Sequence, residues 1–305
     1  MTLQIIQNRK IYLSISIVFI AVSIVFLAMW GLRPGIDFTG GSLLNLRFTQ
    51  ERPVVQDVNA LLKDLNFQNE ISVQPAGNAN FVLRFQETDR ATYEKIMDAF
   101  KVKYPNNAQE ESFESIGPSV GQEIKTKAVY AIILSVIAIM IYIAWAFRKV
   151  SWPVSSWKYA TAAIIALVHD IIIPLGVFAF LGKFFNVEVG LPFVAALLTI
   201  LGYSVNDTIV IFDRTRENLT KTSKFSFEEL VNRSINETLV RSVNTVMTVL
   251  IALFAVLIFG GASVRYFALA LIIGVASGCY SSIFIASPIV VMWEKWNREK
   301  AAKNS

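Results

Sequence analysis

Six long apolar runs constrain this 305-residue chain more than any other feature of its sequence. A helix needs about 20 mainly apolar residues to cross the hydrocarbon core of a bilayer. Only 17% of the residues are charged, against about 25% in a typical soluble domain. The sequence therefore predicts an α-helical polytopic membrane protein with six transmembrane helices. The predicted spans are residues 11–30, 128–147, 159–181, 189–212, 242–259 and 266–293.

The first apolar run has an alternative interpretation as a signal peptide, because Arg9 and Lys10 precede it. Its apolar stretch is longer than the roughly 7–15 residues of a signal peptide, and its end lacks a small-residue cleavage pattern. We therefore expect residues 1–30 to be a short cytoplasmic N-terminus and an uncleaved transmembrane helix. The single cysteine, Cys279, excludes an intrachain disulfide.

Basic residues lie almost entirely on one side of the predicted spans, which indicates orientation because Lys and Arg favour cytoplasmic loops. The opposite short loops contain only Lys183 and Arg265. Both termini are therefore predicted to be cytoplasmic, and the span ends are flanked by Trp152, Trp157, Trp293 and Trp296 as interfacial aromatics. The fifteen basic residues on the cytoplasmic side are Arg9, Lys10, Arg148, Lys149, Lys158, Arg214, Arg216, Lys221, Lys224, Arg233, Arg241, Lys295, Arg298, Lys300 and Lys303.

Residues 31–127 read as one small soluble domain outside the cytoplasm. Helical spacing of apolar residues occurs over 54–65 and again at Tyr93, Ile96, Met97 and Phe100. Strands are predicted at 43–48, 71–73, 81–85 and 111–116, with a turn at 75–78. Strand-helix-strand-strand-helix-strand is the ferredoxin-like order. The predicted plan continues with a five-helix transmembrane bundle over 128–293 and a cytoplasmic tail over 294–305.

The glycine-rich residues 35–41 lack the lysine and preceding strand of a phosphate loop, so by themselves they predict a tight turn. Small residues recur every four positions at Gly274, Gly278, Ser282 and Ala286. Such a stripe favours close helix packing, either within this chain or against another subunit. The sequence shows no nucleotide, zinc or nucleophile-triad signature, so we expect no cofactor, no metal and no nucleic-acid partner.

Ionisable residues inside the spans are the candidates for function, because each costs at least about 2.5–3.5 kcal/mol to insert. His169 and Asp170 lie near the middle of the third span. As helix neighbours they point about 100° apart, so they need not contact each other. They fit either a polar relay or a hydrogen-bonded pair that fixes helix packing.

Asp207 lies in the fourth span, next to Asn206 and about 9 Å deeper than Asp213. It shares a helix face with Tyr203 and Arg214, while Arg241 opens the fifth span at a similar depth. Asp207 and Arg241 can therefore form an ion pair. Burial favours the neutral carboxyl and a nearby cation favours the charged one, so movement of the arginine can load and unload a proton. The alternative is a static ion pair.

Four segments together resemble one known family: GIDFTGGS after the first span, HD in the third, GYSVNDTIVIFDRTREN in the fourth and LVRSVNTVMTVL opening the fifth. They are similar to the SecF type of the SecD/SecF family, membrane subunits of bacterial protein export that are related to the RND proton-driven transporters. The similarity is collinear over essentially the whole chain. The GYSVND register distinguishes it from SecD.

The resemblance implies a subunit without a covalent reaction of its own, located in the bacterial cytoplasmic membrane. It would pair with SecD, dock on the SecYEG channel with YajC as a further partner, and use the proton motive force to promote export of a translocating polypeptide. Protons would be the coupling ion. The family's relay acid falls on Asp207 and its arginine on Arg241. The supporting polar residues would be His169, Asp170, Asn206, Tyr203, Asp213 and Arg214.

Two other classes of function remain open on the sequence. One is a proton-coupled transporter of small molecules that shares the RND-like bundle, although the small external domain argues against it. The other is a structural scaffold of the translocon with an idle polar pair, although the long fourth-span motif argues against that.

Overall fold

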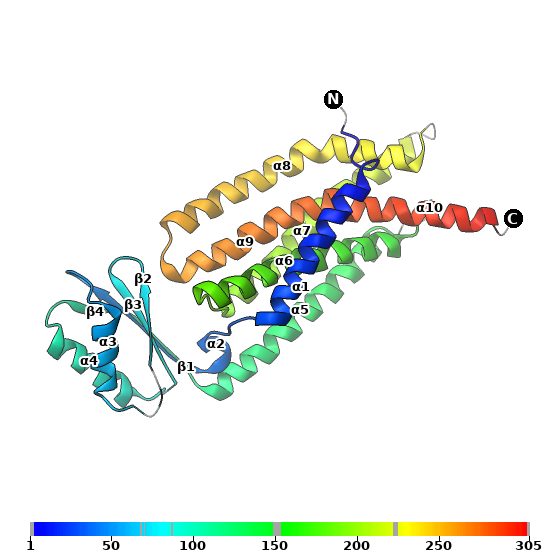
Figure 1. The fold of residues 1–305 in the computed structure, drawn as a ribbon. Helices are drawn as coiled ribbons and strands as arrows, with labels where there is room; N and C mark the ends of the chain where they lie inside the picture. Colours follow the sequence, from blue (N-terminus) through cyan, green and yellow to red (C-terminus); the bar gives the residue numbers. More distant parts are fainter. Residues whose placement is uncertain are drawn as a thin grey trace. The chain divides into compact units, whose positions relative to one another are not determined.

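The computed structural model describes residues 3–67, 69, 71–86, 88–148, 154–221 and 225–303. Lys149, Trp152 and Lys224, which entered the predicted topology, lie outside these ranges. The chain divides into two compact units, Pro34–Ala128 and the combination of Met1–Arg33 with Val129–Ser305. The second unit is the helical bundle (Figure 1).

The prediction of six spans is confirmed: within the described ranges, six helices are long and apolar enough to cross a membrane. The last span is one continuous rod with a π-helical turn, η1, in its middle, and its C-terminal end lies at the same end of the bundle as the start of α1 (Figure 1). The helices are α1 (Arg9–Trp30), α5 (Pro118–Ala146), α6 (Ser156–Phe185), α7 (Leu191–Lys221), α8 (Phe227–Phe259), α9 (Ala262–Ser281), η1 (Ser282–Ala286) and α10 (Ser287–Lys303).

Several helices run well past the predicted spans. α7 has 31 residues and α8 has 33, so at 1.5 Å per residue each exceeds the roughly 30 Å thickness of the hydrocarbon core. The start of α8 is fixed by a capping box in which Ser226 and Glu229 bond each other's backbone. α5 begins ten residues early, at Pro118, because proline suits the first turn of a helix.

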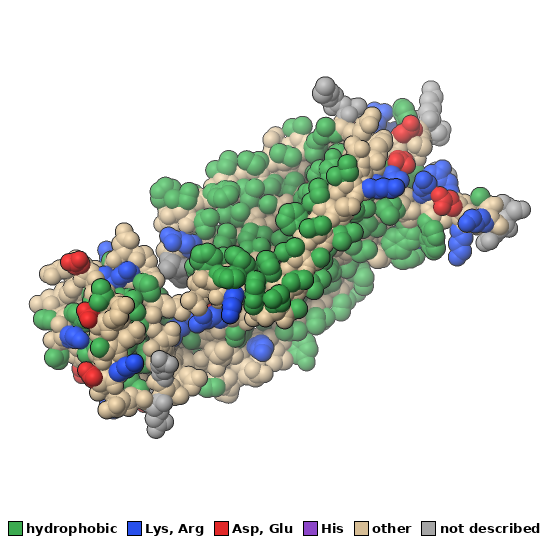
Figure 2. Space-filling model, viewed as in Figure 1, with side chains coloured by type: hydrophobic (Ala, Val, Ile, Leu, Met, Phe, Trp, Pro, Cys, Tyr) green, Lys and Arg blue, Asp and Glu red, His purple; other side chains and the backbone are tan. Residues whose placement is uncertain are grey.

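The bundle has an inner and an outer set of helices. In α6, α7 and the last span, 44%, 50% and 61% of the apolar window is buried, against 11% in each of α1, α5 and α8. Large apolar side chains are therefore exposed on the outer helices, as expected for contact with lipid or another membrane subunit. Figure 2 shows apolar side chains over most of the bundle and basic ones toward its ends, including the end where α10 finishes.

Glycines bring the inner helices into close contact. A methyl group built on Gly278 of α9 would lie 2.8 Å from the Cβ of Ser204 in α7, and one on Gly274 would lie 2.2 Å from Ile200. The predicted packing role of the small-residue stripe is confirmed, and its partner is α7 of the same chain. Gly176 likewise allows close packing of α6 against α1, because a methyl group built on it would lie 2.3 Å from the Cβ of Ser23.

Residues before α1 dock on the part of α8 that extends beyond the predicted span. The side-chain oxygen of Asn232 accepts hydrogen bonds from the backbone N–H groups of Ile5 and Ile6, at 2.9 and 3.1 Å. Both isoleucine side chains are buried in the bundle core. Arg9 adds an ion pair with Glu228 at 2.7 Å. The N-terminal segment is therefore an integral part of this end of the bundle.

The smaller unit has the predicted order of strands and helices. Its antiparallel sheet has the order β2-β3-β1-β4, and its core includes Leu44, Phe81 and Phe100. The bounds are α2 (Ile36–Thr39), β1 (Gly41–Phe48), α3 (Val55–Lys63), β2 (Ser72–Ala76), β3 (Asn80–Phe85), α4 (Arg90–Lys103) and β4 (Ala108–Ile116).

Two details of this unit correct or extend the sequence prediction. Pro75 and Ala76 belong to β2 rather than to the turn, and proline is tolerated there because β2 is an edge strand. The turn follows at Gly77, whose φ is +60°. The glycine-rich run forms the short helix α2 and the first residue of β1 rather than a simple turn. Gly40 also packs closely against the start of α5, since a methyl group built on it would lie 2.6 Å from the Cα of Pro118.

Candidate functional site

Asp170 is a fully buried carboxyl group of the bundle, with none of its surface exposed. Its Oδ2 accepts hydrogen bonds from Ser204 of α7 at 2.5 Å and from Ser281 of α9 at 2.6 Å. Its Oδ1 accepts one from Ser277 of α9 at 3.0 Å. The carboxyl group of α6 therefore links the three inner helices in one polar cluster.

His169 contacts Asp170 directly, a contact that their spacing on the helix left open. The Nδ1 of His169 lies 2.9 Å from the Oδ1 of Asp170. The imidazole ring stacks on Tyr280, whose hydroxyl donates to the backbone carbonyl of Tyr12 in α1. The other ring nitrogen, Nε2, is buried and has no hydrogen-bond partner. Asp170 thus makes its strong contacts to serines, and His169 completes the cluster.

Asp207 is also buried, with 5% of its surface exposed. It lies on α7 one turn beyond Ser204, and the polar side chains of α8 that act on it are those of Ser242 and Arg241. The Ser242 hydroxyl lies close to Asp207 but does not have the geometry of a hydrogen bond. The hydroxyl of Tyr203, four residues before Asp207, donates to the backbone carbonyl of Thr245 at 3.2 Å.

Arg241 lies on the neighbouring helix but does not pair with Asp207 in this structure. Among the described residues, the ion pairs within 4.0 Å do not include these two side chains. Arg241 is exposed, whereas Ser242 is buried. Adjacent helical residues point about 100° apart, so the phase of α8 turns the serine, and not the arginine, toward Asp207.

Arg241 instead lines an open cavity of about 330 Å³. Asp213, Arg214 and Glu217 of α7 line the same cavity, together with apolar residues of α5 and α7. Asp207 is not part of this lining. The exposed Arg241 and its polar cavity therefore lie near the buried carboxyl group but outside contact with it.

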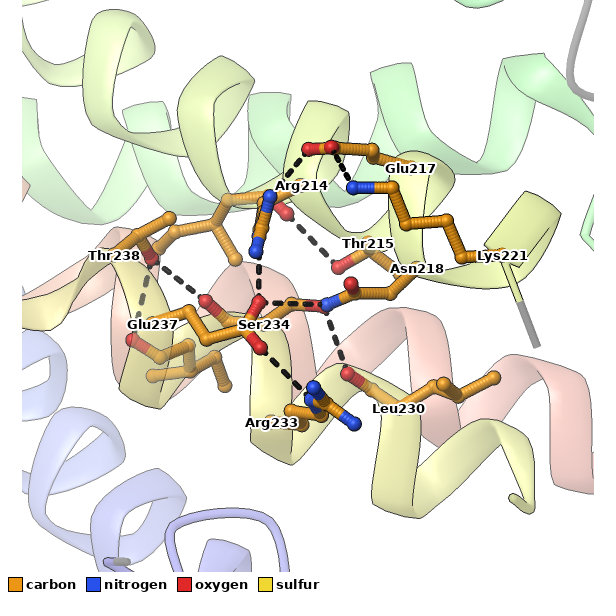
Figure 3. A network of polar contacts seen from close by, with 12 residues as sticks. Arg214, Thr215, Glu217, Asn218, Lys221, Leu230, Arg233, Ser234, Glu237 and Thr238 are labelled. Carbon is orange, nitrogen blue, oxygen red and sulfur yellow. Dashed lines mark hydrogen bonds and ion pairs between the residues drawn. The ribbon is translucent and has the colours of Figure 1, made fainter. Parts of the chain in front are cut away.

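Arg214 belongs to a separate network that ties the ends of α7 and α8 together (Figure 3). Its guanidinium group contacts Glu237 of α8 and Glu217 of α7, each at 2.5 Å. Asn218 donates to Glu237 and Ser234 in the same network, at 2.9 Å each. The structure therefore does not bring Arg214 to Asp207, and its contacts indicate a role in holding the two helices together.

Asn206 and Asp213 lie away from the buried carboxylates. Both are exposed, and Asp213 pairs with Arg216 one turn further along α7 at 3.4 Å. Asp213 is thus an ordinary surface charge.

Sequence reasoning missed the serine shell around Asp170. Serines 204, 277 and 281 lie in apolar runs, where serine hydroxyls commonly bond their own helix backbone. The adjacent π-helical turn was missed as well, although such turns are frequent at functional sites. Within this turn, the Ser282 hydroxyl contacts both the Ser204 carbonyl and the Thr208 hydroxyl, at 3.2 and 2.7 Å.

Two carboxyl groups buried among three packed helices, with a small α/β domain following the first span, define a polytopic membrane transport protein. The sequence model of the family described as "Protein export membrane protein SecD/SecF, C-terminal" matches residues 95–296, and that of the SecD/SecF GG motif matches 25–51. The chain belongs to the SecD/SecF family, among the SecF subunits of the protein translocase.

Individual relatives agree with this assignment. The chain is 43% identical to the protein translocase subunit SecF of Thermobaculum terrenum, covering 96% of this chain and 94% of that one. It is 37% identical to SecF of Anaerolinea thermophila, again covering 96% and 94%.

Solved structures show the same fold. The crystal structure of SecDF, a translocon-associated membrane protein from Thermus thermophilus, matches with a TM-score of 0.82 and 32% identity. The match covers 95% of this chain but only 38% of the longer SecDF chain. A second SecDF crystal structure, in a super-membrane-facing form, matches all of this chain and 40% of the other, with a TM-score of 0.72 and 30% identity.

Proposed function

We propose that this chain is the subunit that, paired with SecD, converts the proton motive force into work on polypeptides leaving the SecYEG channel. The observation that carries the proposal is Asp207, a buried carboxyl inside a membrane helix with no ion-pair partner within 4.0 Å in the described part of the chain. A charge in that position is costly, so the group is suited to take up and release a proton. Arg241, exposed on the cavity one helix away, is the cation that biases this exchange.

Energy per proton limits how such a subunit works. One charge crossing 100 mV is worth about 2.3 kcal/mol. Shifting a conformational equilibrium from 1:99 to 99:1 requires about 5.5 kcal/mol. One proton therefore biases a movement without enforcing it, and we infer either several protons for each exported chain or a loose ratchet, rather than a single power stroke.

The proposal places both termini in the cytoplasm of a bacterial cell, because the basic residues of the short loops lie on that side except for Lys183 and Arg265. Residues 34–128 then face the outside as a ferredoxin-like domain, an assignment supported by the element order and the sheet order β2-β3-β1-β4. This domain is the part we expect to act on the polypeptide, with SecYEG and YajC as neighbours.

The direct test compares Asp207→Asn with Asp213→Asn, a matched change of the exposed carboxylate on the same helix. Proton-dependent stimulation of secretion is measured in membrane vesicles that contain the full translocase. We expect Asp207→Asn to abolish the stimulation while leaving the subunit inserted and associated, and Asp213→Asn to retain it. Wild-type stimulation in Asp207→Asn would refute the relay and leave the scaffold as the function.

The small-molecule alternative requires a different measurement. We expect a SecD-type chain to co-purify with this subunit, and deletion to change secretion without changing susceptibility to drugs. A changed drug susceptibility with normal secretion would favour the transporter.

A further inference from the structure

Asp170 occupies a position in which a permanent negative charge is hard to maintain. It is fully buried, and in the described part of the chain its side-chain contacts are to His169 and to serine hydroxyls, with no Lys or Arg among them. A buried charge without a counter-ion is strongly disfavoured, even where hydroxyl groups donate to it. The balance between a neutral and a charged carboxyl therefore depends on these few groups.

His169 does not supply the missing positive charge. A charged imidazolium needs an acceptor for both ring N–H groups, but the buried Nε2 has none. A neutral imidazole that donates from Nδ1 to the Asp170 carboxyl satisfies the one contact that the structure shows. The pair is therefore a hydrogen bond to a neutral histidine, and the protonation state of Asp170 is decided elsewhere.

Ser281 gives the carboxyl group two ways of completing its hydrogen bonds. The Ser281 hydroxyl lies 2.6 Å from the Oδ2 of Asp170 and 3.2 Å from the backbone carbonyl of Gly278. When Asp170 is ionised, the hydroxyl donates to Oδ2. When Oδ2 carries a proton, the hydroxyl rotates to donate to Gly278, and its oxygen accepts the new O–H. Rotation of one hydroxyl thus accommodates either state without movement of a helix.

We propose that Asp170 is a second proton-binding carboxyl of the bundle, loaded and unloaded as the Ser281 hydroxyl switches between the carboxylate and Gly278. The step adds one proton to Oδ2 and returns it unchanged, so no other reactant is required. The inference rests on the proposed function and extends it: the bundle holds two proton sites, at Asp207 and at Asp170. Ser204 joins them, since it contacts Asp170 and precedes Asp207 by one turn of α7.

The titratable groups around Asp170 come from each helix packed against it. α6 contributes His169, and α7 contributes Asp207. α9 contributes Cys279, which lies within electrostatic range of both carboxyl groups, and Tyr280. α1 contributes Tyr12 through its contact with Tyr280. Because both carboxyl groups lie within electrostatic range of Cys279, we expect protonation of one to favour ionisation of the other.

Infrared difference spectroscopy of the full chain in lipid nanodiscs tests the inference. The spectra are recorded during a pH titration, and the signal is the carbonyl band of a protonated carboxylic acid. We expect a band that responds to pH, disappears in Asp170→Asn, and persists in Asp207→Asn and in the exposed control Asp213→Asn. A set of bands that Asp170→Asn leaves unchanged overturns the proposal, as does a band that it removes but that never responds to pH.

Ser281 provides a second, milder test that keeps the carboxyl group. Ser281→Ala should change the midpoint of the Asp170 band by about one pH unit or more, because a hydrogen bond to a charged acceptor is worth more than one to a neutral group. Ser281→Thr, which retains the hydroxyl, should restore the wild-type midpoint. Equal midpoints in all three proteins would rule out the hydroxyl switch.

The outcome is separable from that of the proposed function, because the spectra require no export. A titrating Asp170 band in a protein that shows no proton-dependent secretion would refute the proposed function but support the proton site at Asp170. Absence of the band, with secretion still sensitive to Asp207→Asn, would refute the proton site at Asp170 but support the proposed function in export.

Discussion

Replacement of Gly278 by alanine is the most direct way to test the close packing of α7 and α9. The new methyl group would lie 2.8 Å from the Cβ of Ser204 and 3.1 Å from its Cα, which is backbone and cannot rotate away. Reaching ordinary contact at 3.4 Å requires the helices to separate by about 0.6 Å, the difference between 3.4 and 2.8 Å. Gly202, in α7, is the matched control, because nothing lies within 4 Å of a methyl group built there.

The magnitude follows from two opposing effects. Overpacking costs about 1–3 kcal/mol. Exchange of glycine for alanine within a helix gains about 0.8–1 kcal/mol, and this gain is common to both variants. We therefore expect Gly278→Ala to be about 1–3 kcal/mol less stable than Gly202→Ala.

Thermal unfolding of the two variants in the same detergent measures this difference. At about 2–4 °C per kcal/mol, Gly278→Ala should unfold several degrees below Gly202→Ala. Equal unfolding temperatures would refute the close approach of Gly278 to Ser204. A shift of the Asp170 carbonyl band in Gly278→Ala alone would show that the displacement reaches the polar cluster.

Three further changes test other parts of the structure. Tyr93 donates to Glu110 in the α/β domain, and this bond together with desolvation raises the pKa of Tyr93 to about 12. Ionisation breaks the bond, so its stabilising effect is present below pH 10 and is lost as the pH rises toward 12. The tyrosinate absorbance missing in Tyr93→Phe should have that raised midpoint, and a midpoint near 10 would contradict the contact. Asn232→Ala leaves the N–H groups of Ile5 and Ile6 without acceptors, costing about 1–3 kcal/mol, and should speed hydrogen exchange of these amides; unchanged exchange would show that the segment is held elsewhere. Ser226→Ala removes the cap of α8 and should lower the unfolding free energy by about 0.5–2 kcal/mol, whereas Ser226→Asp should retain most of it.

The sequence predicted the number of membrane helices because lipid imposes a minimum length and an apolar composition on each. It did not predict where α7 ends or where α8 begins, since these extensions beyond the apolar spans are held by polar contacts such as Arg214 with Glu237. Hydropathy detects the part of a helix that lies in lipid, and a helix continues as long as capping and side-chain partners support it. Hydropathy likewise did not detect that α5 begins at Pro118, ahead of its apolar span.

The candidate site was predictable to a similar extent. Asp207 and the His169–Asp170 pair are conspicuous because ionisable residues are rare in apolar spans. The serines around Asp170 are not, because the rotation of three helices decides which hydroxyl groups face the carboxyl. Depth alone likewise suggested that Arg241 pairs with Asp207, but α8 presents Ser242 to the carboxyl group, and Arg241 lies within electrostatic range without forming an ion pair.

The docking of the N-terminal segment on α8 has a consequence for synthesis of the protein. Ile5 and Asn232 are 227 residues apart in the chain, and a ribosome adds about 5–20 residues per second. Ile5 is therefore synthesised roughly 10–45 s before its acceptor, Asn232. During that interval the side chains of Ile5 and Ile6 lack the part of the core that buries them in the folded protein. A tag fused ahead of Leu3 would be attached to a segment that docks late in folding.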